Sequence, residues 1–216
     1  MKNALRYARF EAFRRLLGPF SAETRKARMA QLETLIGLKP GMRVLDLGGQ
    51  PHIWNFVETP LHIVILNLPG IAMPAPPQSI HNFEYVEGDA CDVNQYKDGE
   101  FEFVFSNSVI EHVGDEEKQR AFAREVRRLA SRYWVQTPSI WFPIEAHTGM
   151  PFWFVMPEAV RAAFIRNWEK KLPAWTDMVK GTTVISRRDM EAFFPDAELL
   201  TERKFGLPKS YILYRG

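Results

Sequence analysis

Polar side chains recur in this sequence at the points where short apolar segments end. These residues are Asp46, Asn67, Asp89 and the run Ser106-Asn107-Ser108. An asparagine can exchange hydrogen bonds with a ribose diol, and an aspartate can accept a hydrogen bond from an exocyclic amine. Each residue alone is equally typical of a turn, because Asn, Asp and Ser favour turns in any protein. Their recurrence predicts a ligand site where the segments end.

Two glycines follow the first of these segments, in the run Val44-Leu-Asp-Leu-Gly-Gly. Gly48 and Gly49 allow a tight backbone turn and let a ligand approach without a Cβ in the way. A dinucleotide site would carry the pattern G-x-G-x-x-G, whereas this sequence continues as Gln50-Pro-His-Ile. The pattern therefore argues against a nicotinamide cofactor. A structural turn between a strand and a helix is the alternative to a ligand loop.

The elements that would position these residues are short apolar strands separated by helices. The predicted strands are 43–47, 63–66, 83–86, 101–105 and 133–136, and the predicted helices are 21–38, 115–131 and 158–168. Such alternation is typical of a parallel sheet covered on both faces, which binds ligands outside the carboxyl ends of its strands. Residues 198–204 and 211–215 predict two final strands. They should pair antiparallel, because the segment between them is too short for a crossover helix.

The composition is that of a globular protein, with 216 residues, 46% hydrophobic and 25% charged. The length favours one domain with an added cap or arm. The longest apolar stretches are too short to cross a bilayer, and the first residues lack the unbroken apolar core of a secretory signal. The single cysteine, Cys91, excludes an intramolecular disulfide and a cysteine-rich metal site. We therefore expect a cytoplasmic protein that holds no metal.

Positive charge is concentrated near the N-terminus. Residues 1–43 contain ten basic and three acidic residues, an excess of seven positive charges, while the whole chain carries a net charge of only +2. Such an arm could contact phosphate, nucleic acid or an anionic membrane surface. It could equally be the solvated face of a packed helix. The apolar stripe of Phe13, Leu16, Leu17 and Phe20 favours this second interpretation.

Three segments of the sequence resemble one enzyme family. They are Val44-Leu-Asp-Leu-Gly-Gly, Glu87-Gly-Asp-Ala and Phe101-Glu-Phe-Val-Phe-Ser-Asn-Ser-Val-Ile-Glu-His-Val. They are similar to motifs of class I S-adenosylmethionine-dependent methyltransferases, most closely the small-molecule branch called type 11. The resemblance covers roughly residues 40–140. It implies a Rossmann-like, mostly parallel α/β sheet of seven strands that ends in an antiparallel pair.

The resemblance also implies a division of the chain and a set of cofactor contacts. Residues 1–40 would form a helical cap, 41–137 the cofactor-binding core and 138–216 the acceptor side of a single domain. The methionine end of S-adenosylmethionine would lie near Asp46, Gly48, Gly49 and Gln50, the ribose near Asn67 and Leu68, the adenine near Asp89 and Ala90, and the sulfonium near Ser106 and Asn107. The family usually has further glycines at Gln50 and His52 and an acidic residue at Asn67.

Four residues are candidates for handling the methyl acceptor: Glu111, His112, Glu145 and His147. Methyl transfer is a direct displacement, so the protein has to align the reactants and remove a proton where the nucleophile carries one. Histidine has a suitable pKa for this second task. The alternatives are that His112 bonds to backbone at a helix start and that Glu145 and His147 brace the loop over 138–156.

The sequence therefore predicts a methyltransferase that acts on a small-molecule or carrier-linked acceptor. Aromatic residues such as Trp141, Phe142 and Trp153 could accommodate a lipid or a lipid-linked sugar, and the basic arm could contact a membrane surface. A nucleic-acid acceptor is disfavoured, because the Asn/Asp-Pro-Pro-aromatic run of amino-methylating nucleic-acid enzymes is missing. The alternative function is a non-catalytic relative that serves as a binding or assembly subunit.

Overall fold

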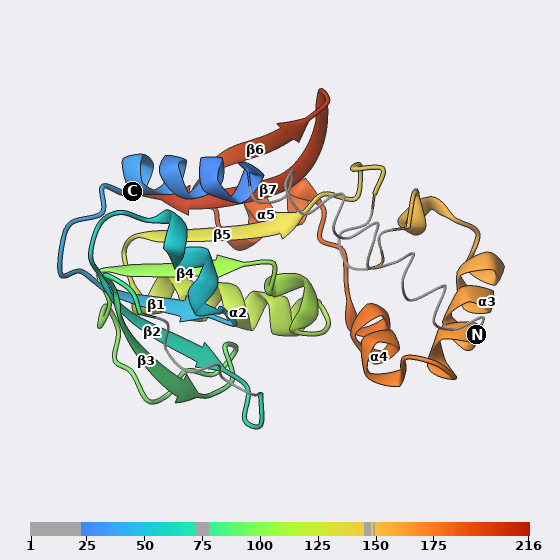
Figure 1. Cartoon of the computed structure of the whole chain (residues 1–216), viewed down its shortest axis with the longest axis horizontal. Helices are drawn as coiled ribbons and strands as arrows, with labels where there is room; N and C mark the ends of the chain where they lie inside the picture. The colour runs from blue at the N-terminus through green and yellow to red at the C-terminus, as the bar shows by residue number, and fades with distance from the viewer. Residues whose placement is uncertain (1–22, 72–77, 145–147, 149) are drawn as a thin grey trace.

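A seven-stranded sheet forms the centre of the computed structural model, which describes residues 23–71, 78–144, 148 and 150–216 (Figure 1). The strand order is β3-β2-β1-β4-β5-β7-β6. The first five strands run parallel, and β7 lies antiparallel to both β5 and β6. The predicted Rossmann-like α/β sheet with a closing antiparallel pair is therefore confirmed.

The strands are β1 (Arg43–Leu47), β2 (His62–Asn67), β3 (Asn82–Glu87), β4 (Phe103–Asn107), β5 (Tyr133–Pro138), β6 (Glu198–Lys204) and β7 (Leu207–Arg215). The α-helices are α2 (Glu116–Leu129), α3 (Glu158–Glu169), α4 (Pro173–Gly181) and α5 (Arg187–Phe193), preceded by a helix over 23–36. Three short 3₁₀ helices are η1 (Pro51–Phe56), η2 (Ile110–His112) and η3 (Trp153–Val155). None of the helices in the described part of the chain has the length and apolar character needed to cross a bilayer.

Apolar side chains point alternately to the two faces of the sheet, and they form a separate hydrophobic core on each face. In β2, Ile63 and Ile65 pack with the helix over 23–36, whereas Val64 and Leu66 pack on the face that α2 and α5 cover. Because successive strand residues point to opposite faces, a strand buried on both sides reads as one unbroken apolar run. This explains why the central strands could be located from the sequence.

Some element boundaries differ from the sequence predictions for local reasons. β4 begins at Phe103, two residues later than predicted, because the Phe101 amide donates to the carbonyl of Leu129 at the end of α2. The connection from β1 to β2 contains only η1, with Pro51 at its first position. Helices α4 and α5 were not foreseen, although Ser186 caps α5 by accepting from the Asp189 amide. Residues 1–22, with the predicted apolar stripe and Ser21, lie outside the described residues.

Helices α3 and α4 lie beyond the carboxyl ends of the parallel strands (Figure 1). Aromatic contacts hold this region together: Trp153 of η3 stacks on Trp168 of α3 with a ring separation of 5.2 Å, and Trp168 meets Trp175 of α4 edge to face at 4.8 Å. The segment over 138–156, expected to be a long ordered loop, contains η3 and a bridge between Ile144 and Pro151. Of the aromatic side chains in this segment, Trp153 is buried, whereas Trp141 and Phe152 are exposed.

The carboxyl group of Asp46 is buried inside the core on the side of the helix over 23–36. Asp46 has no exposed surface, and the indole Nε1 of Trp54 donates to its Oδ2 at 2.8 Å. Its Oδ1 is buried with no hydrogen-bond partner among the described residues. Burial raises the pKa of Asp46 to about 7, despite the opposing effect of the Trp54 hydrogen bond.

This burial predicts a pH-dependent stability. The folded chain keeps the Asp46 proton up to about pH 7, whereas the unfolded chain loses it near pH 4. Stability from the neutral carboxyl is thus fully present below about pH 4 and is lost as the pH rises to about 7. The neutral variant Asp46→Asn should stabilise the protein more at pH 8 than at pH 5, by on the order of a few kcal/mol. Thermal denaturation at both pH values, with exposed Asp92→Asn as control, measures the difference. An equal effect at both pH values would contradict it.

Candidate functional site

A cavity of about 310 Å³ lies at the carboxyl edge of the sheet, where β1, β2, β3 and β4 end. Six of the residues proposed from the sequence line it: Gly48, Asn67, Leu68, Asp89, Ala90 and His112. The lining is completed by Ser108, which the sequence placed at a strand end without assigning it a cofactor contact, and by residues that the sequence did not indicate: Leu66, Ile71, Gly88, Val109 and Val113. Gly88, Ser108, Val109 and Val113 directly adjoin a strand end or η2, whereas Leu66 lies within β2 and Ile71 lies four residues after its end. The cavity is bounded by both apolar and polar side chains.

The two glycines after β1 are required by close contacts. Gly48 has a φ of +72°, and a Cβ there would lie 2.7 Å from both methyl groups of Val109. A Cβ on Gly49 would lie about 2 Å from the carboxylate atoms of Asp46, at 1.9, 2.0 and 2.1 Å. Neither position has room for a larger residue. The loop therefore packs directly between the buried carboxyl and the side chain that forms the opposite cavity wall.

Asn67 ties the end of β2 to this glycine loop. Its side-chain nitrogen donates to the carbonyl of Gly49 at 3.0 Å, and the amide of Gly48 donates to the carbonyl of Leu66 at 2.8 Å. Asn67 is buried and lines the cavity. A carboxylate at this position could not donate to the Gly49 carbonyl. The asparagine, where the resembled family usually has an acidic residue, therefore has a structural partner in this chain.

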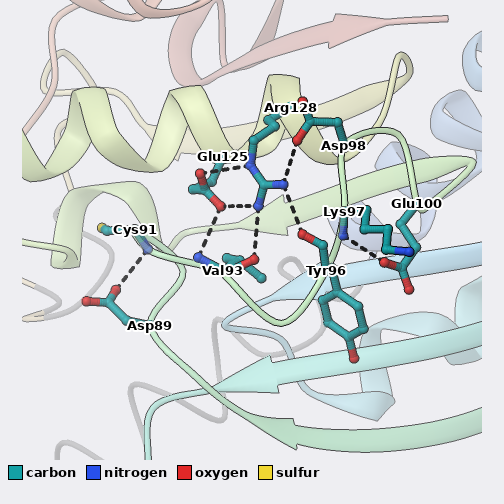
Figure 2. Close-up of polar contacts among 9 residues, drawn as sticks. All are labelled: Asp89, Cys91, Val93, Tyr96, Lys97, Asp98, Glu100, Glu125 and Arg128. Carbon is teal, nitrogen blue, oxygen red and sulfur yellow. Dashed lines mark hydrogen bonds and ion pairs between the residues drawn. The ribbon is translucent and has the colours of Figure 1, made fainter.

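Asp89 presents an ionised carboxylate at the other end of the cavity. Its Oδ1 accepts from the backbone amide of Cys91 at 2.8 Å (Figure 2). The ammonium group of Lys118 in α2 lies 3.5 Å from Oδ2. Burial alone would raise the pKa of Asp89, but the Cys91 amide and the Lys118 ammonium hold it below its ordinary value. The adjacent Cys91 is buried, and burial together with the Asp89 charge raises its pKa to about 11.

Arg128 of α2 fixes the loop between β3 and β4, which begins with the cavity residues Gly88 to Ala90. Its Nη2 donates to the carbonyl of Val93 at 2.9 Å, and its Nη1 donates to the carbonyl of Tyr96 at 3.0 Å (Figure 2). The Glu125 carboxylate accepts from Arg128 and from the Val93 amide. Hydrogen bonds to its backbone groups fix the conformation of this loop, although the loop has no regular secondary structure. No sequence pattern indicated this contact.

The three polar residues at the end of β4 have different roles. Ser106 is buried, and its hydroxyl donates to the carbonyl of Leu47 in β1 at 3.1 Å. Asn107 accepts from Arg28 through its side-chain oxygen. Ser108 has a φ of +58° and lines the cavity, and its hydroxyl donates to Gln136 Oε1 at 2.9 Å. The structure thus brings Ser108 to the cavity and places the predicted Ser106 and Asn107 behind it.

Arg28, on the helix over 23–36, has a buried guanidinium at the same edge. It binds both carboxylate oxygens of Glu202 in β6, at 3.1 Å from Nε and 2.8 Å from Nη2. Its Nη1 also donates to the side-chain oxygens of Asn107 and Gln136. Burial opposes ionisation of Glu202, but Arg28 holds the pKa of Glu202 below its ordinary value. The paired charges connect the helix to three strands of the sheet.

His112 lies in η2 and lines the cavity, while its neighbour Glu111 points elsewhere. The Nδ1 atom of His112 is 3.2 Å from the hydroxyl of Thr182, which follows α4. Glu111 is almost completely buried and accepts from the Thr137 hydroxyl at 3.0 Å. The Thr183 amide donates to the Glu111 carbonyl at 2.7 Å. These contacts attach η2 to the segment between α4 and α5.

The remaining predicted residues that the structure describes are not part of the cavity wall. Asp46 and Gly49 lie beneath the loop, and exposed Gln50 precedes η1 without a side-chain capping bond. Glu145 and His147 lie outside the described residues, so their assignment stays a prediction. A second cavity, of about 220 Å³, lies between 140–143 and 152–155. Among the described residues, no group of His, Cys, Asp or Glu side chains is arranged to hold a metal ion.

Comparison with known proteins gives a family match and a set of similar structures. Residues 71–132, from the β2–β3 connection to the start of β5, match the family described as a methyltransferase domain. A search of curated protein sequences finds no significant match to the chain.

Three solved structures illustrate the similarity in fold. Phosphoethanolamine N-methyltransferase 2 from Haemonchus contortus, in complex with S-adenosyl-L-methionine, is 15% identical over 80% of this chain and 37% of its own, with a TM-score of 0.55. An O-methyltransferase family protein from Burkholderia thailandensis is 14% identical over 94% and 57%, with a TM-score of 0.53. Magnesium protoporphyrin IX methyltransferase from Synechocystis is 12% identical over 88% and 80%, with a TM-score of 0.50.

The chain thus spans less than two thirds of the length of the first two of these proteins. At such low identity the similarity concerns the fold, and it covers the sheet and the helices that enclose it. The strand order, the matched domain and the cavity at the carboxyl edge agree with one another. Residues 71–132 are thus similar in sequence to a methyltransferase domain, and the described part of the chain has the fold of the methyltransferases named above.

Proposed function

We propose that the chain binds S-adenosylmethionine in the cavity at the carboxyl edge and transfers its methyl group to a small-molecule or carrier-linked acceptor. The observation that carries this proposal is the convergence of Gly48, Asn67, Asp89 and His112 on one cavity. These residues come from four different segments of the chain. Local turn formation does not explain why four separate segments meet at one cavity, so this arrangement is a property of the fold.

The donor set of the cavity fits an adenosine with an amino-acid tail. At one end, the Asp89 carboxylate would accept from the exocyclic amine of adenine, and Leu68, Ile71 and Val113 would contact the ring. Asn67 and Leu68 lie next along the wall, where the ribose would bind. Gly48 and Ser108 would face the tail. When bound, the cofactor supplies an electrophilic methyl group on a sulfonium.

The contribution of the protein to such a reaction is alignment and proton removal. His112 reaches the cavity wall, and its Nδ1 contact with Thr182 orients the ring. The imidazole of His112 would then take a proton from an acceptor hydroxyl or ammonium group. His147, supported by Glu145, remains the second candidate for this role.

The acceptor would approach from the side of α3 and α4. The segment after β5 contributes the second cavity, and its walls consist of Ile140, Trp141, Phe142, Pro143 and the aromatic side chains of η3. Trp141 and Phe152 are 68% and 61% exposed. Large exposed aromatic side chains support an acceptor with an apolar portion, such as a lipid carrier. The named neighbours act on phosphoethanolamine and magnesium protoporphyrin IX, so the fold itself accommodates unlike acceptors.

Asn67→Asp tests the assignment of the cofactor loop. The substitution restores the acidic residue usual in the family, but here it removes the donor to the Gly49 carbonyl and places a carboxylate oxygen against it. Cofactor affinity should therefore fall by roughly 1–3 kcal/mol, as expected for an unsatisfied polar group. Isothermal titration with S-adenosylhomocysteine measures this loss of affinity. The same substitution at the exposed Asn55, Asn55→Asp, is the matched control. Unchanged or tighter binding by Asn67→Asp would show that the loop does not depend on this bond.

His112→Ala and His147→Ala test the two candidate bases separately. The variant that removes the true base should lower turnover roughly 10²–10⁴-fold while cofactor affinity changes little. The comparison requires single-turnover rates of methyl transfer to an unmethylated acceptor, and titrations of the same variants with S-adenosylhomocysteine. A parallel loss of melting temperature, cofactor affinity and rate would assign the histidine a structural role.

The alternative function, a non-catalytic binding or assembly subunit, makes an opposite prediction about the parent protein. Such a protein would not bind S-adenosylmethionine even at millimolar concentration. Its glycine loop would then be retained only because Gly48 and Gly49 pack against Val109 and Asp46. A titration of the unmodified chain separates the two functions before any variant is made.

A further inference from the structure

The hairpin between β6 and β7 carries an aromatic side chain at its tip. Lys204 pairs with Leu207, so Phe205 and Gly206 form a two-residue turn, with φ angles of +53° and +78°. A turn of this kind needs a positive φ at both central residues, which are usually asparagine, aspartate or glycine. Phe205 is 85% exposed. Neither the backbone of the turn nor the core of the chain therefore accounts for a phenylalanine at this position.

The segment after β5 contains a second phenylalanine with the same combination of properties. Phe152 has a φ of +57° and is 61% exposed. Trp141 and Val155 in the same segment are exposed as well. A positive φ is unusual for a bulky residue, and strained positions of this kind cluster at functional sites. In the described part of the chain, both phenylalanines with a positive φ are thus exposed to solvent.

The hairpin and this segment lie side by side at the carboxyl ends of the parallel strands. The last residue of β5 pairs with Ser210 of β7, and the amide of Ser139 donates to the carbonyl of Lys209 at 2.9 Å. The turn of the hairpin therefore extends beyond the end of β5 (Figure 1). Trp141 follows the Ser139 contact by two residues, and its amide donates to the Ser139 hydroxyl. Phe205 and Trp141 thus belong to the same end of the molecule.

The tip of the hairpin is positively charged. Residues 203–209 contain three basic residues and no acidic residue. Arg203 is exposed, and the ammonium group of Lys204 lies 5.8 Å from the centre of the Phe205 ring. The preceding carboxylate, that of Glu202, is already paired with a buried guanidinium. An anionic surface would therefore complement the charge of the tip.

These features fit the surface of an anionic membrane. Aromatic rings are favoured at the boundary between lipid headgroups and acyl chains, and basic side chains are attracted to anionic headgroups. A stable protein partner would instead cover one broad, continuous patch. We propose that the β6–β7 hairpin docks on an anionic phospholipid membrane, with Phe205 inserted at this boundary and Trp141 and Phe152 beside it. The inference does not depend on cofactor binding, because none of these residues lines the cavity at the carboxyl edge.

Vesicle binding by the full chain tests this inference. In cosedimentation, the parent protein should bind vesicles of mixed phosphatidylglycerol and phosphatidylcholine more tightly than vesicles of phosphatidylcholine alone. Phe205→Asn removes the ring but suits the positive φ, so it should weaken binding to the mixed vesicles roughly tenfold. The melting temperature of the free protein should stay equal or rise. Phe205→Trp should retain vesicle binding, because tryptophan is also favoured at the membrane boundary.

Two matched pairs of variants separate this surface from the rest of the chain. Ile80 is 58% exposed and lies two residues before β3, at the opposite end of the sheet, so Ile80→Asn should leave vesicle binding unchanged. Arg203→Gln should weaken binding to the mixed vesicles about fivefold at low salt, and less at high salt. Arg124→Gln, at an exposed position of α2, should have no effect.

Four results would overturn the inference. A parent protein that binds neither kind of vesicle, or both equally, does not recognise an anionic membrane. Unchanged vesicle binding by Phe205→Asn would place the lipid contact elsewhere, for example on the basic residues of 1–43. A lower melting temperature and lost binding in both Phe205 variants would make Phe205 a structural residue. A parent dimer that Phe205→Asn converts to a monomer, without loss of vesicle binding, would show that a second copy of the chain covers the hairpin.

Discussion

The buried guanidinium of Arg28 determines the arrangement of the edge on which the site is built. It joins a helix from the first part of the chain to β4, β5 and β6 through Asn107, Gln136 and Glu202. Breaking a buried ion pair by removing one partner typically costs about 3–5 kcal/mol, because the other charge stays behind. The orientation of Ser108 depends on the same contacts, since its hydroxyl shares Gln136 with Arg28.

A second chain of contacts runs from the core to the cavity. Trp54 holds the Asp46 carboxyl, Asp46 packs beneath Gly49, and the Gly49 carbonyl accepts from Asn67. Each member restricts the next, because there is no space for even one additional carbon at Gly49. The glycine loop is therefore shaped by the core beneath it before any ligand binds. Preorganisation of this kind reduces the entropy that a ligand loses when it orders a loop.

The sequence was sufficient to predict the sheet because its strands are buried on both faces and read as continuous apolar runs. It also indicated which strand ends are polar, and four of those segments line the cavity. The direction in which each polar side chain points was harder to predict, because a shift of one residue along a strand turns a side chain to the other face. Ser106 and Ser108 would share a face in a regular strand, but Ser108 follows the end of β4 with a φ of +58°, which changes the direction of its side chain. The burial of Asp46 could have been read from its alternation with Val44, whereas the contacts of Arg28 and Arg128 join residues far apart in sequence.

The Arg28–Glu202 pair spans 174 residues of sequence, from the first described helix to the penultimate strand. During synthesis the helix leaves the ribosome long before β6 exists, and loop closure over such a distance is slow compared with local pairing. Until β6 and β7 have paired, Arg28 has no carboxylate partner and the helix has no charged anchor at the carboxyl edge. We therefore expect the cofactor-binding edge to be completed only after the last strands have folded. A nascent or C-terminally shortened chain would then contain most of the sheet without a finished binding site.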